Sequence, residues 1–229
     1  KHLETLEVEP IDEFGASILS QTRDFKLPIA TTTAVAVYDM AGNNILKSRK
    51  FRRYGEVACE FIDAQVKEKQ TIMIEKYASI RTGRDSDAVV YDASHDLRQA
   101  LERGFDNEFE VHQAEYKRLW TRADLVIKGD DKLQHALRFN IFQLMSTPSM
   151  DDDRTNIGAK LMHGEEYGGH AFWDTELFIL PFFTYVFPGV AKNLVTYRYN
   201  LIDKARENAK LNGYAGAKYP WESADTGDE

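Results

Sequence analysis

The sequence predicts two classes of structure in succession: antiparallel β strands over residues 1–88, then α helices up to residue 229. In the first stretch, apolar residues occur in short alternating runs with turn signals between them, and this period of two is typical of half-buried strands. From Ser94 onward the apolar residues are spaced by three and four, as on one face of a helix. We therefore expect part of an antiparallel sheet or sandwich, followed by a helical region.

Four segments of the first stretch are strand candidates. Residues 31–38 are rich in β-branched side chains and lead through Gly42-Asn43-Asn44 into Ile45-Leu46, a pattern that predicts a hairpin. Residues 16–22 and 56–62 are two further candidates.

The fourth candidate, residues 71–80, alternates between apolar and polar side chains. One face collects four apolar residues, which are Ile72, Ile74, Ala78 and Ile80. Such alternation predicts a strand that is buried on that face and exposed on the other.

Helix signals follow in series. Ser94 can cap a first helix and Gly104 can end it. A second apolar stripe spans residues 109–120, and a third spans residues 133–145 and closes at Pro148. We expect three separate helices from these signals.

The last sixty or so residues return to helix after a long polar loop. Residues 172–187 are apolar on nearly every face, so this helix is expected to be buried all round, whereas residues 188–212 carry a single apolar stripe. The loop before them, residues 149–169, is too long for a simple connector, and long loops in compact domains are often functional.

Trp173 and Asp174 lie in the densest group of chemically active residues, at the end of this glycine-rich loop. An indole ring can pack on the C–H face of a pyranose, while a carboxylate can accept two hydroxyl protons. The pair is therefore a candidate sugar site. The alternative is that Asp174 caps a helix and Trp173 belongs to the core.

Trp221 and Glu222 form a second pair of an indole followed by an acid, again in a loop next to a helix. In a barrel of helical hairpins the loops at one end converge on a central pocket, so both pairs could face one ligand. The alternative is that Trp221 covers a helix end and Glu222 is solvated.

The charge balance excludes two classes of partner. The formal net charge is −8, with acids spread along the chain, so we expect no binding to nucleic acid or to an anionic membrane surface. The longest apolar run, residues 177–183, is too short to span a bilayer. Cys59 is the only cysteine, which favours a reducing compartment and predicts a cytoplasmic location.

Other chemistries have weaker signals. His163, His170, Glu165 and Glu166 lie near Asp174 but lack the helical spacing of zinc ligands, so we expect no metal. Residues 151–153 are three aspartates without the alternating ligands of a calcium loop, which favours a solvated turn. Cys59, on a predicted strand, is expected to be a buried structural thiol.

Five stretches resemble, in order and spacing, the disaccharide phosphorylases of glycoside hydrolase family sixty-five, which act on kojibiose, trehalose, nigerose or maltose. They are IGAK at 157–160, GEEYGGHAFWDTE at 164–176, LPFF at 180–183, YRYNLIDKARENAKLNGY at 197–214 and GAKYPWESADTG at 216–227. The similarity extends upstream through TGRD at 82–85 and LWTRADLVIKGD at 119–130. It covers nearly the whole chain, and FWDTE with PWES is its most specific part.

The resemblance implies a domain plan. Residues 1–88 would be the C-terminal part of an N-terminal β-sandwich domain, residues 89–128 a helical linker, and residues 129–229 the first helices of a six-hairpin α/α barrel that carries the active site. The remainder of the same polypeptide would be needed to complete the barrel, so the resemblance implies a fragment of a longer protein.

The resemblance also implies roles for individual residues. Trp173 and Asp174 match the family pair that holds the non-reducing glucose, while Tyr167, Trp221 and Glu222 match positions that line the sugar pocket near the acceptor. The family's general acid follows a TG-x-x-E pattern that is absent here, so no catalytic residue is assigned to this chain. Neither a metal nor a cofactor is expected.

The implied reaction is inverting cleavage of an α-linked glucose disaccharide, with inorganic phosphate as co-substrate and β-glucose 1-phosphate as product, by a protein that is a homodimer when intact. PWES at 220–223 favours the kojibiose or trehalose branch over the maltose branch. Two alternatives remain open, a hydrolase resembling acid trehalases and a carbohydrate-binding fragment without catalysis.

Overall fold

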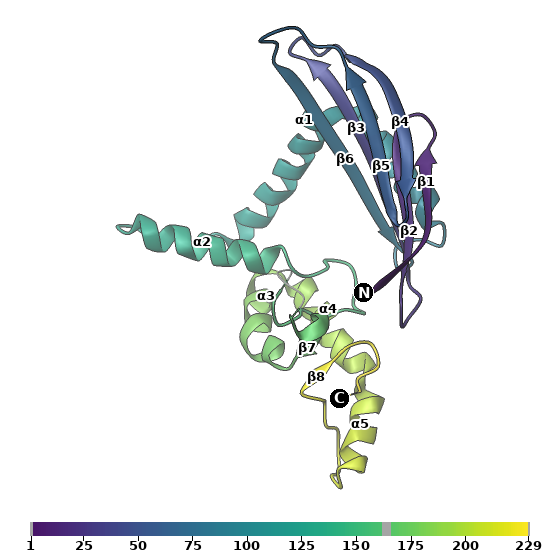
Figure 1. The fold of residues 1–229 in the computed structure, drawn as a ribbon. Coiled ribbons are helices and arrows are strands. Elements are labelled where there is room, and N and C mark those ends of the chain that lie inside the picture. The colour runs from purple at the N-terminus through teal and green to yellow at the C-terminus, as the bar shows by residue number, and fades with distance from the viewer. Residues whose placement is uncertain (1, 162–165, 229) are drawn as a thin grey trace. The chain divides into compact units, whose positions relative to one another are not determined.

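A computed structural model describes residues 2–161 and 166–228, and the chain forms two compact units, Lys1–Gln113 and Ala114–Glu229 (Figure 1). Each unit has a core of its own and is described by itself. The succession of strands and then helices is confirmed. The finer domain boundaries near residues 88 and 128 stay predictions.

The first unit contains antiparallel strands in two sheets. Its described residues form β1 (Leu3–Ile11), β2 (Gly15–Thr22), β3 (Pro28–Asp39), β4 (Leu46–Tyr54), β5 (Val57–Ala64) and β6 (Ile72–Thr82). The larger sheet has the order β1-β2-β3-β6, while β4 and β5 pair with each other. Every strand candidate from the sequence is present, and β1 is an addition that the pattern did not indicate.

The predicted hairpin after β3 forms only next to its turn, where Tyr38 and Asn44 make an antiparallel bridge and the Ile45 N–H donates to the Val37 carbonyl. The turn itself forms, because the Asp39 carboxylate accepts hydrogen bonds from the backbone N–H groups of Ala41 and Asn43. However, β2 pairs with β3 only as far as Ala34, and the bridge at Tyr38 does not extend into a ladder. After the turn the chain continues into the second sheet, where β4 pairs with β5.

The helix α1 (Val89–Ala123) covers one face of the larger sheet with its first turns. Leu97 packs against a cluster that includes Ala34 and Tyr77, and Thr32 Oγ1 donates a hydrogen bond to the carbonyl of Ala93 at 3.1 Å. The helix begins before Ser94, so the predicted cap is wrong, and the Ser94 hydroxyl instead donates to the Val90 carbonyl.

Gly104 interrupts α1, as its position in the sequence predicted. Its backbone has φ 77° and ψ 163°, a conformation that is essentially restricted to glycine. The stretch written as α1 is therefore two helical segments joined at this residue.

The buried face of β6 is the opposite of the one predicted. The side chain of Tyr77 is buried under α1, whereas Ile74 and Ile80 are 62% and 63% exposed. Alternation in a sequence shows that the two faces of a strand differ. Which face is covered depends on the helix that packs there, and here α1 lies on the Tyr77 face.

The second unit is mainly helical. It contains the end of α1 together with α2 (Asp131–Met145), α3 (Leu180–Val186), α4 (Pro188–Asn200), α5 (Ile202–Leu211), the short strands β7 (Ala171–Phe172) and β8 (Glu222–Ser223), a 3₁₀ turn (Glu166–Gly169) and a π-helical turn (Thr175–Ile179). Asp130 caps α2 by accepting from the N–H of Leu133 at 2.9 Å. Phe183 is fully buried at the centre of a core that includes Phe187 and Leu194.

Of the two C-terminal helix predictions, the first is wrong and the second is confirmed. Residues 172–187 form a strand end, the π-helical turn and α3 rather than one helix, and Phe178 and Tyr185 are 75% and 87% exposed. The expectation of burial all round is therefore wrong for this chain. The amphipathic stripe of residues 188–212 is confirmed, although a break at Leu201 divides it into α4 and α5.

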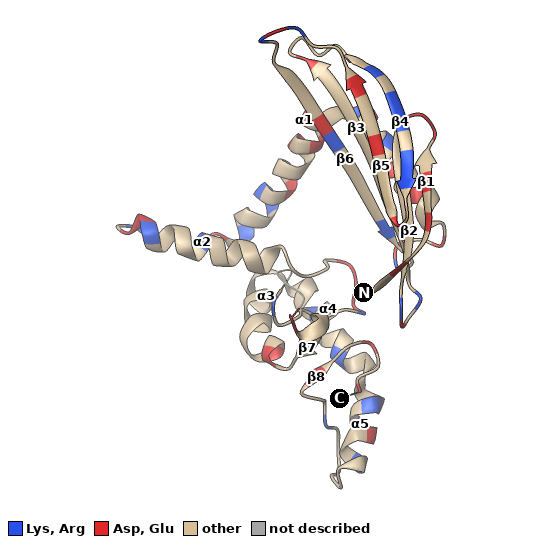
Figure 2. Ribbon diagram, viewed as in Figure 1, with Lys and Arg blue, Asp and Glu red and all other residues tan. Residues whose placement is uncertain are grey.

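Charged residues of both signs are distributed over both units (Figure 2). β4 is the exception, since five of its nine residues are basic, namely Lys47, Arg49, Lys50, Arg52 and Arg53. The described helices include none with the length and apolar character required to cross a membrane.

Candidate functional site

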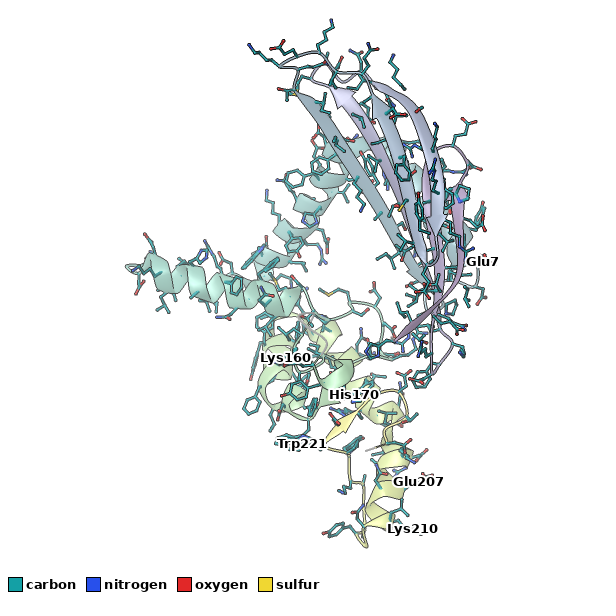
Figure 3. All side chains as sticks on the ribbon, viewed as in Figure 1. Glu7, Lys160, His170, Glu207, Lys210 and Trp221 are labelled. Carbon is teal, nitrogen blue, oxygen red and sulfur yellow. The ribbon has the colours of Figure 1, made fainter. Side chains whose placement is uncertain are left out.

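The two motifs that combine an indole and an acid meet at a short antiparallel ladder. Ala171 pairs with Ser223 and Phe172 pairs with Glu222, so β7 and β8 lie side by side. Trp173 directly follows β7 and Trp221 directly precedes β8. Figure 3 shows Trp221 and His170 beside this ladder.

The rings of Trp173 and Trp221 are in contact. Their centroids are 5.2 Å apart and their planes meet at 76°, a favourable edge-to-face arrangement. Trp173 is 39% exposed and Trp221 is 54% exposed. Two indoles that are distant in the sequence therefore form one accessible aromatic surface.

Phe172 and Tyr167 complete this surface. Phe172 is buried and contacts two rings edge-on. The distance between ring centroids is 6.3 Å to Trp221 and 5.4 Å to Tyr167. Tyr167 is exposed and sits in the left-handed backbone region with φ 62°. We refer to Tyr167, Phe172, Trp173 and Trp221 as the aromatic cluster.

Both acids of the two motifs lie next to the aromatic cluster. Asp174 is exposed and begins the π-helical turn without a capping hydrogen bond from its side chain. The alternative of a capping Asp174 beside a core Trp173 is therefore wrong. Glu222 is partly exposed, and its Oε2 lies 3.7 Å from His170 Nδ1.

A buried polar network lies between the same segments, and sequence reasoning did not find it. Arg198 of α4 donates two hydrogen bonds to the Glu176 carboxylate, at 2.9 and 3.0 Å, and a third to Ser223 Oγ at 3.1 Å. Asn156 Nδ2 donates to Glu176 Oε1 at 2.9 Å. One signal was present, because Arg198 lies four residues after Leu194 and so falls on the apolar stripe of α4.

Two tyrosines extend this network. The Tyr197 hydroxyl donates to the carbonyl of Ala224 at 2.7 Å and lies 3.2 Å from Ser223 Oγ. The Tyr219 hydroxyl donates to the Arg198 carbonyl at 2.9 Å. Burial raises the pKa of both phenols, so both remain neutral donors at neutral pH.

A cavity of 150 Å³ lies beside the network, with Asn156, Tyr197, Ser223 and Asp225 among its lining residues. Water occupies about 30 Å³ per molecule in the liquid, so this volume suits a few waters and not a disaccharide.

The structure also shows where several other residues considered in the sequence lie. Cys59 is only half-buried, on β5, rather than fully buried. Asp152 pairs with Arg154 at 2.8 Å in a turn. Across residues 2–161 and 166–228 no three potential ligands come together to hold a metal, while His163 and Glu165 of the metal alternative lie outside the described residues. Gly164 lies outside them too.

Exposed indoles beside carboxylates are suited to hold a sugar, because a ring can pack on its C–H face and a carboxylate can accept its hydroxyl protons. The family model for the glycosyl hydrolase family 65 N-terminal domain matches residues 1–119, and the one for the family's central catalytic domain matches residues 138–229. The chain belongs to glycosyl hydrolase family 65. The resemblance seen in the motifs is thereby confirmed.

Individual relatives agree with this assignment. A kojibiose phosphorylase of Caldanaerobacter subterraneus subsp. tengcongensis is 45% identical over 100% of this chain and 30% of its own length. An alpha,alpha-trehalose phosphorylase of Thermoanaerobacter brockii is 40% identical over 72% of this chain and 21% of its own length. The chain thus spans less than a third of the curated relatives it matches.

A solved structure supports the fold. A putative kojibiose phosphorylase from the human microbiome superposes with a TM-score of 0.82 over 100% of this chain and 29% of its own, at 22% sequence identity. This match shows the β-sandwich strands and the first barrel helices as a shared fold, in agreement with the predicted fold class.

Proposed function

We propose that the protein to which this chain belongs is an inverting disaccharide phosphorylase. It would cleave an α-linked glucose disaccharide with inorganic phosphate and release β-glucose 1-phosphate and glucose or another acceptor. The observation that carries the proposal is the contact between the Trp173 and Trp221 rings, 5.2 Å apart and both accessible, in a chain of this family.

Within this proposal Trp173 and Asp174 hold the non-reducing glucose. The indole face packs on the C–H face of the sugar, and the exposed Asp174 carboxylate accepts hydrogen bonds from two hydroxyls. Tyr167, Trp221 and Glu222 line the neighbouring part of the site, toward the acceptor sugar. Trp173 and Trp221 flank the β7–β8 ladder in sequence, Glu222 belongs to it, and Tyr167 contacts Phe172 of β7.

The reaction needs no protein base. A phosphate oxygen attacks the anomeric carbon while the glycosidic C–O bond breaks on the opposite face, and the departing oxygen takes a proton from a general acid. Inverting hydrolases need a second carboxylate to activate water, whereas phosphate is already a nucleophile. The acid is assigned to no residue of this chain, and the protein supplies positioning and electrostatic stabilisation.

Kojibiose, the α-1,2-linked diglucose, is the first substrate to test. The kojibiose phosphorylase noted above matches the whole chain at 45% identity, and the trehalose phosphorylase matches 72% of it at 40%. The proposal further includes a cytoplasmic location, a homodimer, and no cofactor besides phosphate as co-substrate.

A product assay of the complete polypeptide tests the proposal. A panel of glucose disaccharides is incubated with and without inorganic phosphate, and we expect phosphate-dependent β-glucose 1-phosphate, with kojibiose the best substrate. Free glucose without any need for phosphate would identify a hydrolase instead. Binding of disaccharides without either product would identify a carbohydrate-binding protein.

Asp174→Ala tests the assigned site. Loss of a positioned polar group typically costs about 2.7 kcal/mol or more of transition-state stabilisation, so kcat/KM should fall by about a hundredfold or more. Asp203→Ala, an exposed acid on α5 with 87% of its side chain accessible, is the matched control and should retain activity. Equal activity of the two variants would remove Asp174 from the site.

A further inference from the structure

Arg198 connects the two segments that carry the indoles. Its guanidinium binds Glu176, three residues after Trp173, through Nε and Nη2. The remaining Nη1 binds Ser223, two residues after Trp221. Only 10% of the Arg198 side chain is exposed, so these contacts are made largely out of water.

The β7–β8 ladder alone is a weak support for this arrangement. It consists of two residue pairs, and a single backbone hydrogen bond contributes only about 1 kcal/mol net. Isolated short ladders are marginal in water. A further link between the two segments would therefore help to keep the Trp173 and Trp221 rings in contact.

Arg198 also holds the loop before Trp221 from the other side. The Tyr219 hydroxyl donates to the Arg198 carbonyl at 2.9 Å, and α4 is anchored in the core by the buried Leu194 and Tyr197. One residue of a rigid helix thus binds both indole-bearing segments.

From this geometry we propose that Arg198 is a positioning residue that sets the spacing of Trp173 and Trp221. It acts through Glu176 and Ser223 and does not touch the sugar. This inference rests on the proposed function for its consequence in substrate binding, but the positioning itself is a property of the folded chain.

The chemistry requires arginine. The planar guanidinium places two parallel N–H groups on one carboxylate and leaves a third for a hydroxyl. A lysine ammonium is a single point donor, so Arg198→Lys keeps the charge but cannot hold both segments in one geometry.

The test must avoid simple unfolding. Removal of one partner of a buried pair leaves an unpaired charge, whereas replacement of both by neutral groups is often tolerated. The double variant Arg198→Met with Glu176→Gln leaves no charge, and glutamine keeps an acceptor for Asn156. The control is Arg81→Met with Asp96→Asn, which neutralises an arginine–carboxylate pair in the first unit.

The direct readout is circular dichroism. Two indoles in contact couple excitonically and give a pair of circular dichroism bands of opposite sign in the indole absorption region. The variant Trp221→Phe lacks one of the two indoles, so the bands that it loses are those of this pair. In the complete protein we expect the Arg198/Glu176 double variant to lose at least half of the signal with its helix content unchanged, and the Arg81/Asp96 control to keep it. An unchanged signal in the Arg198/Glu176 variant would overturn the inference.

Kinetics supply the second readout. Because the rings bind the sugar in the ground state and transition state alike, KM should rise by about tenfold or more with a smaller change in kcat, since a misplacement of about 1 Å can cost up to a hundredfold. Arg198→Lys should keep the fold but should not show the original KM. If the wild type lacks phosphorolysis, the proposed function fails, while the dichroism still decides the positioning role.

Discussion

Each of the two units contains an arginine–carboxylate pair that joins two elements, and two such pairs, one from each unit, differ in their environment. In the first unit Arg81 of β6 contacts Asp96 of α1 at 2.7 Å, with 39% and 34% of the two side chains exposed. In the second unit Arg198 of α4 contacts Glu176 at 2.9 Å, with 10% and 25% exposed. Water can replace the first contact but hardly the second, so the same chemistry secures a helix on a sheet in one unit and a fixed site geometry in the other.

The surroundings of the two pairs explain the difference. The Arg81 pair sits at the border of an apolar contact between α1 and the sheet, where Leu97 and Tyr77 already hold the helix. The Arg198 pair joins segments whose indoles, Trp173 and Trp221, remain partly exposed outside the main core of the unit. A buried ion pair is therefore most consequential where the hydrophobic core does not reach.

The largest effect is expected from the core of the second unit. Phe183→Ala removes a fully buried ring and should lower the free energy of unfolding by about 3–5 kcal/mol. Leu97→Ala, the counterpart in the first unit, should cost about 2–5 kcal/mol. Denaturant unfolding of the complete protein measures both, and costs below 1 kcal/mol would mean that these residues are not core.

Next in size is Glu176→Leu, which leaves the Arg198 guanidinium buried without its carboxylate. We expect a loss of about 3 kcal/mol, as for other broken buried pairs. Asp96→Leu in the first unit should cost much less, because Arg81 can turn to water. Hydrogen exchange in α4 and in β6 would report each local effect, and equal losses would contradict the contrast drawn between the pairs.

Tyr197→Phe is expected to cost about 1 kcal/mol at neutral pH, the contribution of a buried hydroxyl's hydrogen bond. The effect should also depend on pH. Burial raises the pKa of Tyr197 above its usual value near 10, so its stabilising contribution is complete below about pH 10 and declines as the pH rises through the native pKa.

The alkaline loss of stability should accordingly be shallower in Tyr197→Phe. Tyr77→Phe is the matched variant in the first unit, because burial raises the pKa of Tyr77 as well. Unfolding measured between neutral pH and about pH 11 tests both. Wild-type and variant curves that stay parallel would show that neither phenol is linked to folding.

Asp96→Asn should have the smallest effect. The hydrogen bond from Arg81 lowers the pKa of Asp96, so its contribution is present above about pH 4 and is lost as the pH falls through the lower native pKa. Because the pair is about a third exposed, we expect less than about 1 kcal/mol. The measurement is the free energy of unfolding of wild type and variant as the pH is lowered. A difference between them of several times this amount would contradict a pair that is screened by solvent.

Local pattern predicted much of the fold. The strands at residues 16–22, 56–62 and 71–80, the break at Gly104 and the stripe on α4 and α5 all follow from side-chain period and backbone preference. The partner of β4 and the buried face of β6 did not follow, because edge pairing and helix cover are decided by residues far away in the sequence.

The candidate site divides in the same way. The sequence motifs indicated five candidate residues, because indoles beside carboxylates are recognisable by residue type. These residues are Tyr167, Trp173, Asp174, Trp221 and Glu222. Arg198, Glu176 and Ser223 were not named, since their importance lies in mutual distance and burial. The sugar-binding roles of the five motif residues stay predictions until the variants are measured.

Composition and spacing thus determined by themselves most of the segments that become strands or helices and the side chains that could face a sugar, since both depend on neighbours along the chain. Only the tertiary structure decided that the two indoles touch and that one guanidinium holds their segments together. These contacts join residues separated by long stretches of sequence, and desolvation gives them their strength.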